Sequence, residues 1–471
     1  MVFLALPLGI LLPTVIGWLG LRLLEGKTPV LFRTERCVAG LVIGLNVSMY
    51  FVFLVHVVGL ISLNVIGFLS VQILLTAILG FFWWRKKDAL HQRAEAPAPS
   101  PLVSTAIKIF VTLVLVWTVG KILLGSVFLI ASPVYFDDVY KNWDLRGKIF
   151  YETQNLELGI MQPNGAIDTG GISSYPPAVS MVKTWVSTIA GEWNQGLISS
   201  IHMLWYISAV LLLYFALRRL VSWQWSLIGA YVLSSLPLYL IHGSVAYADV
   251  YLSVHIFLAL SYVFFAAYSA RPEHTATFFR LAAVATGALV FTKNEALLLH
   301  LPPLLLILII TLWQLFKQHR IGRKEVKTVL IWFVVSIAAV LVPWLIFKWS
   351  HGLTFGNAKG ITGMKLGWQP GVLSSIWVNT FLEGNWNLFF PLFIGVMIAC
   401  WRTALRTSML ILSAFFLIVY FGQYPLYLFT PLSTEAIMQT GYARGLIQLM
   451  PVAVLLLTAL LATSRKNDAR L

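Results

Sequence analysis

Long apolar segments recur along almost the whole chain, and this feature constrains the fold more than any other. A helix that crosses a lipid bilayer needs about 20 mostly apolar residues. We interpret thirteen segments as spans, at 2–24, 37–58, 60–84, 104–130, 197–217, 224–241, 249–269, 279–292, 297–316, 328–348, 386–401, 407–424 and 445–463. The sequence therefore predicts an all-α, polytopic bundle of about 13 transmembrane helices.

The composition excludes a soluble enzyme. Only 11% of the 471 residues are charged and 59% are hydrophobic, whereas soluble chains carry roughly 25% charged residues. The 18 Trp and 17 Tyr residues suit the aromatic belts that form at both membrane surfaces. No HExxH, Walker A, GxGxxG or paired CxxC motif occurs. The sequence therefore gives no indication of a zinc protease, an ATP-driven protein or a dinucleotide-binding enzyme.

The net charge of +15 predicts orientation rather than a nucleic-acid partner. About two thirds of the Lys and Arg residues fall in alternate loops, and cytoplasmic loops are enriched in these residues. This pattern predicts an N-terminus outside and a C-terminus in the cytoplasm. The first apolar run has no basic region before it and no small-residue cleavage site after it, so we expect a retained helix.

A polar segment rich in Pro and Ala, at 85–101, divides the chain into two parts. Residues 1–101 are predicted to form three leading transmembrane helices and a cytoplasmic linker. Residues 102–471 are predicted to form the main transmembrane core, with a first large outer loop at 131–196.

The outer loop begins with the most polar stretch of the extramembrane chain. Its carboxylates and cations are Asp137, Asp138, Asp144, Lys141, Arg146 and Lys148. If the segment from Asp138 is helical, Asp138, Lys141 and Arg146 lie on one side of it. Such a carboxylate can act as a base or a metal ligand while the cations hold a phosphate. The alternative is a solvated loop whose charges pair with one another.

Further polar residues mark other outer segments. Tyr175 precedes two prolines, which predicts a stiff turn. Ionisable groups at the ends of later spans are functional candidates by default; they are His242, Asp249, Lys293, Glu295 and Arg444. Lys293 and Arg444 suit a lipid phosphate or diphosphate, with Asp249 and Glu295 orienting them. In the alternative reading, Lys293 pairs with Glu295 or Asp249 for structural reasons alone.

In this order the motifs resemble those of the bacterial GT-C class of membrane glycosyltransferases, which includes dolichyl-phosphate-mannose-type and aminoarabinose-type transferases. The matching residues are Asp138, Trp143, Leu145, Arg146 and Lys148, then Tyr175-Pro176-Pro177, Ala248-Asp249, Thr292-Lys293-Asn294-Glu295, and Arg444 followed by Pro451. The resemblance covers about residues 102–463. The three leading helices and the lack of a long soluble C-terminal segment depart from relatives such as oligosaccharyltransferases, which leaves the acceptor open.

The resemblance implies roles for these residues. The catalytic general base is expected at Asp138, with Asp137 and Asp144 as neighbours. The residues expected to bind the donor phosphate are Arg146, Lys148, Lys293 and Arg444. The supporting residues are Asp249, Glu295, Tyr175 and His242. Some relatives need a divalent metal and others do not, so Asp137 and Asp138 are a candidate site for Mg²⁺ or Mn²⁺, and no other cofactor is expected.

The function so implied is inverting transfer of a sugar from a polyprenyl-phosphate donor to a glycan, lipid or protein acceptor. It would take place on the outer face of the cytoplasmic membrane and contribute to a cell-envelope glycan. Two alternatives stay open. A polytopic transporter or lipid flippase would place charges near mid-membrane, and an O-antigen ligase or polymerase would carry a larger late outer loop than residues 349–385.

Overall fold

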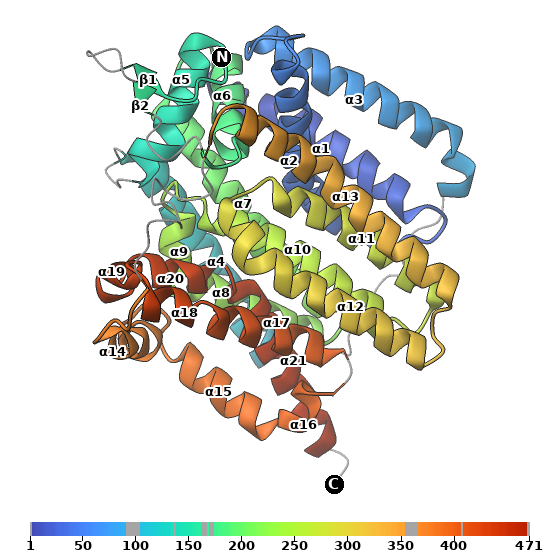
Figure 1. The fold of residues 1–471 in the computed structure, drawn as a ribbon. Coiled ribbons are helices and arrows are strands. Elements are labelled where there is room, and N and C mark those ends of the chain that lie inside the picture. Colours follow the sequence, from blue (N-terminus) through green and yellow to red (C-terminus); the bar gives the residue numbers. More distant parts are fainter. Residues whose placement is uncertain are drawn as a thin grey trace.

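The computed structural model describes residues 2–90, 104–132, 134, 138–161, 167–168, 174–353, 366–406 and 408–468, and this part is almost entirely helical (Figure 1). The longer helices are α1 (Val2–Glu25), α2 (Arg33–Val57), α3 (Val65–Arg85), α4 (Thr105–Ala131), α7 (Gln195–Arg218), α10 (Asp249–Tyr268), α11 (Pro272–Val290), α12 (Leu301–Lys317), α13 (Arg323–Ser350), α17 (Met409–Gly422) and α21 (Met450–Asp468).

Shorter elements connect them. The short α-helices are α5 (Leu145–Thr153), α6 (Ala178–Ala190), α8 (Trp223–Ser235), α9 (Pro237–Gly243), α14 (Val372–Trp377), α15 (Phe389–Ala399), α16 (Trp401–Ala404), α18 (Tyr424–Phe429), α19 (Ser433–Ile437) and α20 (Gly441–Ile447). A 3₁₀ turn covers Lys87–Leu90, and wider π-helical turns cover Val139–Asp144, Ala296–His300 and Val378–Leu382. Strands β1 (Ile160–Met161) and β2 (Ile167–Asp168) form one small antiparallel pair.

The chain is a multi-pass membrane protein. In the described ranges, 9 helices are long and apolar enough to cross a bilayer, or 11 when each of two bent pairs counts as one span. Helices α8 and α9 meet at 74°, and α20 and α21 at 50°. The first bend follows from Pro237, which pushes Leu236 out of helical geometry, to φ −67° and ψ 116°.

These 11 spans match 11 of the 13 predicted segments, and two are not confirmed. Segment 386–401 forms α15, whose 11 residues extend only about 16 Å, roughly half of the hydrocarbon thickness. Segment 279–292 is the second half of α11, which begins with the polar residues Pro272, Glu273 and His274. Pro272 and Glu273 are exposed, and the buried residues of α11 begin at Thr275, so the polar first turn lies outside the packed interior.

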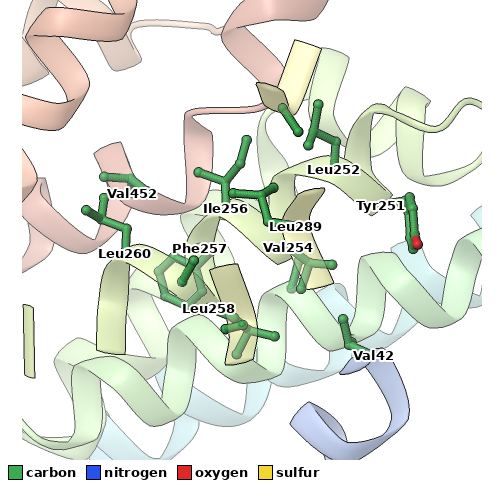
Figure 2. Close-up of a cluster of buried hydrophobic side chains, with 14 of the residues drawn as sticks. Val42, Tyr251, Leu252, Val254, Ile256, Phe257, Leu258, Leu260, Leu289 and Val452 are labelled. Atoms are coloured by element: carbon green, nitrogen blue, oxygen red, sulfur yellow. The ribbon is translucent and has the colours of Figure 1, made fainter. Parts of the chain in front are cut away.

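Helix α10 occupies the centre of the bundle. Every residue of its apolar stretch is buried, including Val254, Phe257 and Leu260. Figure 2 shows these side chains between Val42 of α2, Leu289 of α11 and Val452 of α21. Because α10 is covered on all sides, its first residue, Asp249, lies at the middle of one end of the bundle.

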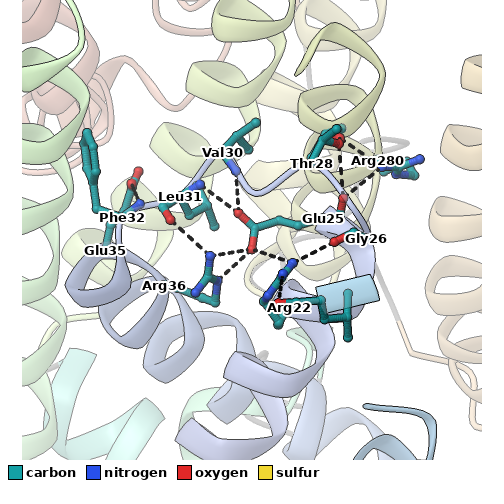
Figure 3. Close-up of polar contacts among 12 residues, drawn as sticks. Arg22, Glu25, Gly26, Thr28, Val30, Leu31, Phe32, Glu35, Arg36 and Arg280 are labelled. Atoms are coloured by element: carbon teal, nitrogen blue, oxygen red, sulfur yellow. Dashed lines mark hydrogen bonds and ion pairs between the residues drawn. The ribbon is translucent and has the colours of Figure 1, made fainter. Parts of the chain in front are cut away.

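A buried ion cluster ties the leading helices to the core (Figure 3). Glu25, at the end of α1, accepts hydrogen bonds from the backbone N–H groups of Val30 and Leu31 at 2.8 and 2.7 Å, and pairs with Arg36 of α2 at 2.7 Å. Arg280 of α11 donates to the carbonyl oxygen of Leu24 at 2.9 Å. The α1–α2 hairpin is therefore anchored on a core helix. The domain boundary near residue 101 stays a prediction, because residues 91–103 lie outside the described ranges.

The basic loops meet at one end of the bundle, which we call the basic end: the segments that follow α1, α7, α10 and α12. Arg219, after α7, donates to Glu35 of α2 at 2.9 Å, and Arg320, after α12, donates to the carbonyl oxygen of Ala267 at 2.8 Å. Asp249 begins α10 and Tyr268 ends it, so its 20 residues separate the two ends by about 30 Å. The short helices α5, α9, α19 and α20 lie along the opposite side, at the left of Figure 1.

Candidate active site

Asp138 stands where the chain turns back over the bundle after α4. It directly precedes the π-helical turn Val139–Asp144, which leads into α5. Asn142 Nδ2 lies 3.3 Å from Asp138 Oδ1 and donates a hydrogen bond to it. The Asp138 carboxylate keeps 35% of its side-chain surface exposed, so it is anchored by the protein and still open to a substrate.

Arg444 joins Asp138 to the centre of the bundle. Its Nη1 pairs with Asp138 Oδ2, and its Nε lies 2.9 Å from Asp249 Oδ2. The guanidinium group also lies over the ring of Tyr247, 4.7 Å from the ring centre. One cation from α20 therefore links the carboxylate of Asp138, before α5, with the first residue of α10.

Asp249 is the buried anchor of this cluster, with 1% of its surface exposed. Besides Arg444, it pairs with Lys293 Nζ at 3.0 Å, and Gln448 Nε2 lies 3.4 Å from its Oδ1. His242 Nδ1 lies 3.3 Å from its Oδ2. The N-terminus of α10 further stabilises a negative charge at this position. A buried carboxylate with these partners fixes both cations in place.

Lys293 connects Asp249 to a second, more exposed carboxylate. Its Nζ lies 3.2 Å from Glu295 Oε1, which also accepts a 3.4 Å hydrogen bond from the Tyr175 hydroxyl. Burial favours the neutral amine, but Asp249 and Glu295 outweigh it and raise the pKa of Lys293 above its ordinary value. The rings of Trp143 and Tyr175 lie 5.8 and 5.9 Å from Nζ. Lys293 is therefore positively charged and lies close to two aromatic rings.

The structure thus brings together most of the predicted site. The residues that it gathers are Asp138, Asp249, Lys293, Glu295, Arg444, Tyr175 and His242. Arg444 and Lys293 each share buried Asp249 with one partly exposed carboxylate, Asp138 or Glu295. The Arg444 side chain is 25% exposed, so an incoming anion can compete with Asp138 for it, whereas the Lys293 side chain is 2% exposed.

Two of the predicted residues have positioning contacts instead. Asp144 is buried, pairs with Lys183 of α6 and accepts a hydrogen bond from Gln195. Arg146 is buried and donates to the carbonyl oxygen of Tyr175 at 2.8 Å, and burial lowers its pKa to about 9. Both residues hold the start of α5 onto the turn at Tyr175 and onto α6.

The prediction that Lys148 binds the donor phosphate stays a prediction. Its side chain is 49% exposed and lies 3.7 Å from Glu152, one turn later on α5. The sequence analysis assumed a regular α-helix from Asp138 onward. The structure instead has a π-helical turn before α5, and such a turn changes the side of the helix on which later residues lie. The ion pair described for Lys148 is therefore with Glu152 of α5, and the ion pair described for Asp138 is with Arg444.

Two residues that support the site, Gln448 and Lys348, were not predicted from the sequence. Gln448 follows Arg444 by four residues, so its spacing on one helix face was an available signal. Lys348 Nζ donates to the carbonyl oxygen of Ser174 at 2.6 Å and thereby secures the turn before Tyr175. No pattern in the sequence connects Lys348, at the end of α13, with a turn 174 residues earlier.

The candidate Mg²⁺ or Mn²⁺ site at Asp137 and Asp138 stays a prediction. Asp137 lies outside the described residues, as does the side chain of Lys141. Among the side chains that the structure describes, no three His, Cys, Asp or Glu residues are grouped to hold an ion. Asp138 is already paired with Arg444, so we derive no step through a metal.

No protein-family model and no curated protein matches the chain. Solved structures do: ArnT from Cupriavidus metallidurans in the apo state has a TM-score of 0.53 at 13% identity, over 78% of this chain and 62% of ArnT. ArnT bound to undecaprenyl phosphate has a TM-score of 0.54 at 13% identity, over 77% and 63%. The chain spans less than two thirds of the length of ArnT. It has the fold of ArnT, a GT-C glycosyltransferase, as the order of its motifs predicted.

Proposed function

We propose that the protein is an integral-membrane glycosyltransferase that moves a sugar from a polyprenyl-phosphate donor to an acceptor. The observation that carries this proposal is the chain of contacts from Asp138 through Arg444 and Asp249 to Lys293. It unites an accessible carboxylate with two fixed cations at one end of the bundle. The ArnT structure bound to undecaprenyl phosphate adds support for a polyprenyl-phosphate ligand on this fold.

In the proposed reaction, Asp138 acts as the general base. Its carboxylate takes the proton of the acceptor hydroxyl group while the hydroxyl oxygen forms a bond to the anomeric carbon. The bond from that carbon to the phosphate oxygen breaks on the opposite face, which inverts the anomeric configuration. The bonding electrons leave with the polyprenyl phosphate.

Arg444 and Lys293 stabilise the charge that develops on the leaving phosphate. Both are held by Asp249 before substrate arrives, and preorganised charges of this kind are a large source of transition-state stabilisation. The donor phosphate competes with Asp138 for Arg444 and with Glu295 for Lys293. Donor binding thereby releases Asp138 from its ion pair and frees it to accept a proton.

The remaining residues position this machinery. Tyr175 orients Glu295, and His242 and Gln448 lie against Asp249. Asp144 and Arg146 secure the segment that carries Asp138. If Asp137 joins Asp138 in holding Mg²⁺ or Mn²⁺, the ion would add positive charge next to the phosphate.

We also propose the orientation and location that the sequence predicts: the N-terminus outside and the C-terminus in the cytoplasm, in the cytoplasmic membrane. The basic end would then face the cytoplasm, and the Asp138 cluster would lie on the outer face, where cell-envelope glycans are modified. Cysteine labelling from each side of intact cells, at Lys27 and at Glu152, tests this directly. Labelling of both residues from the same side would contradict it.

One observation favours the transporter alternative. The bent pairs α8–α9 and α20–α21 resemble the discontinuous helices that bind substrates in transporters. The charged cluster nevertheless lies at the first residue of α10, at the end of the bundle, whereas transport sites lie near the midplane.

The deciding experiment uses purified protein and undecaprenyl-phosphate-linked sugars of several kinds, supplied with a membrane extract as acceptor source. We expect at least one donor to release undecaprenyl phosphate, and only when the extract is present. Mass spectrometry measures this release. Counterflow of undecaprenyl phosphate across sealed vesicles, without release from any donor, would instead identify a transporter.

A further inference from the structure

A second site lies at the basic end, far from the Asp138 cluster. A cavity of about 490 Å³ opens between α11, the end of α12 and the start of α13, and its volume is within the range of small-ligand sites. Arg320, one of its lining residues, bonds to the carbonyl oxygen of Ala267 near the end of α10. The length of α10 therefore puts the cavity about 30 Å from Asp249.

The polar lining of the cavity is predominantly cationic. Arg280, Arg320 and Lys324 line it, against one carboxylate, Glu325. The acceptors of Arg280 and Arg320 include the carbonyl oxygens of Leu24 and Ala267, which leave the charge of each guanidinium in place. Glu325 Oε2 accepts from the backbone N–H of Gly322 at 2.9 Å, as a helix cap. The site thus offers positive charge to an anion.

The rest of the lining is apolar and continues into surfaces that suit lipid. Phe279, Phe316 and Trp332 form part of the wall. On the helices beside it, Trp313 of α12 is 55% exposed and Ile331 of α13 is 50% exposed. Such side chains on membrane helices contact acyl chains, so a molecule in this cavity can have its charged group among the cations and its tail along α12 and α13.

We infer that this cavity binds an anionic phospholipid, with the phosphate group at Arg280, Arg320 and Lys324. Basic pockets between transmembrane helices are known to select acidic lipid headgroups. A small soluble anion would use the cations and gain nothing from the aromatic wall. The site is separate from the proposed donor site, so the inference does not depend on the proposed reaction.

Native mass spectrometry of the full-length protein in detergent tests the inference, with phosphatidylglycerol and phosphatidylcholine of identical acyl chains as probes. We expect phosphatidylglycerol to remain bound at concentrations where phosphatidylcholine does not. Lys324→Gln should weaken phosphatidylglycerol binding about fivefold, which is the usual effect of one cation near an anionic lipid. Lys327→Gln is the matched control, because Lys327 is exposed on the same helix turn but does not line the cavity.

A second variant fills the cavity without altering charge. Ala276 lines it from α11 and is exposed, so Ala276→Trp should abolish retention of phosphatidylglycerol while the protein stays monodisperse. Equal binding of both lipids, or equal weakening by Lys324→Gln and Lys327→Gln, would overturn the site. Glycerophosphoglycerol that binds as tightly as the intact lipid would overturn the assignment to a phospholipid.

Discussion

Arg444 and Asp249 are separated by 195 residues in the sequence, yet Arg444 Nε lies 2.9 Å from Asp249 Oδ2. The same guanidinium pairs with Asp138. Asp249 is buried and Asp138 is partly exposed, so the two ion pairs of Arg444 differ in environment. We therefore expect the buried Arg444–Asp249 pair to stabilise the fold and the Arg444–Asp138 pair to be accessible to substrate.

Asp249→Asn should destabilise the protein strongly. Removing the charge leaves Arg444 and Lys293 without their buried partner, and breaking a buried pair costs about 3–5 kcal/mol. Asp138→Asn, which removes a partly exposed pair, should cost at most about 1 kcal/mol. Thermal unfolding of both variants in the same detergent measures the difference. Equal melting temperatures would show that Asp249 does not anchor the cluster.

Arg444→Lys should retain the fold and lose function. A lysine keeps the charge but has no planar fork with which to bridge Asp138 and Asp249 at once. We expect sugar transfer to fall by about 10²–10³-fold, as for loss of one preorganised donor to a transition state. A steady-state rate within a few-fold of the wild-type rate would remove Arg444 from the proposed mechanism.

Lys148→Ala should leave both activity and stability nearly unchanged. Its exposed pair with Glu152 belongs to a class that contributes about 0–1 kcal/mol. Transfer rates and melting temperature should both match the wild-type values within error. A large loss of transfer at unchanged stability would return Lys148 to the donor site.

Asp144 and Lys183 should behave as a coupled structural pair. Lys183→Met alone leaves a buried carboxylate without its cation and should cost about 3–5 kcal/mol. In the double variant Asp144→Asn/Lys183→Met, much of that loss should be recovered, with transfer per folded molecule retained. A double-mutant cycle on melting and on turnover checks both points. Loss of turnover in a well-folded double variant would place Asp144 in the chemistry.

The membrane fold was largely predictable because a bilayer imposes its own length and polarity on each span. The two unconfirmed spans show where this rule weakens. Helix α11 is largely buried by other helices from Thr275 onward, whereas Pro272 and Glu273 in its polar first turn are exposed, so its apolar part is shorter than a full span. Helix α15 is apolar but only 11 residues long, and hydropathy alone does not reveal where a helix ends.

The sequence predicted which residues belong to the site better than it predicted their contacts. Asp138, Lys293 and Arg444 were recognised as ionisable groups next to spans, and the fold brings them into one cluster. The direction of Arg146 and Lys148 depended on the π-helical turn at Val139–Asp144, which no periodicity in the sequence indicates. Lys183 was missed because it lies within an apolar helix and has its partner, Asp144, 39 residues away.

The most direct test of the account is turnover by Asp138→Asn with an undecaprenyl-phosphate-linked sugar that the wild-type protein accepts. We expect this variant to fold, to bind undecaprenyl phosphate through Arg444 and Lys293, and to transfer no sugar above background. Sugar transfer at the wild-type rate would show that Asp138 is not the base, and the proposed mechanism would be wrong.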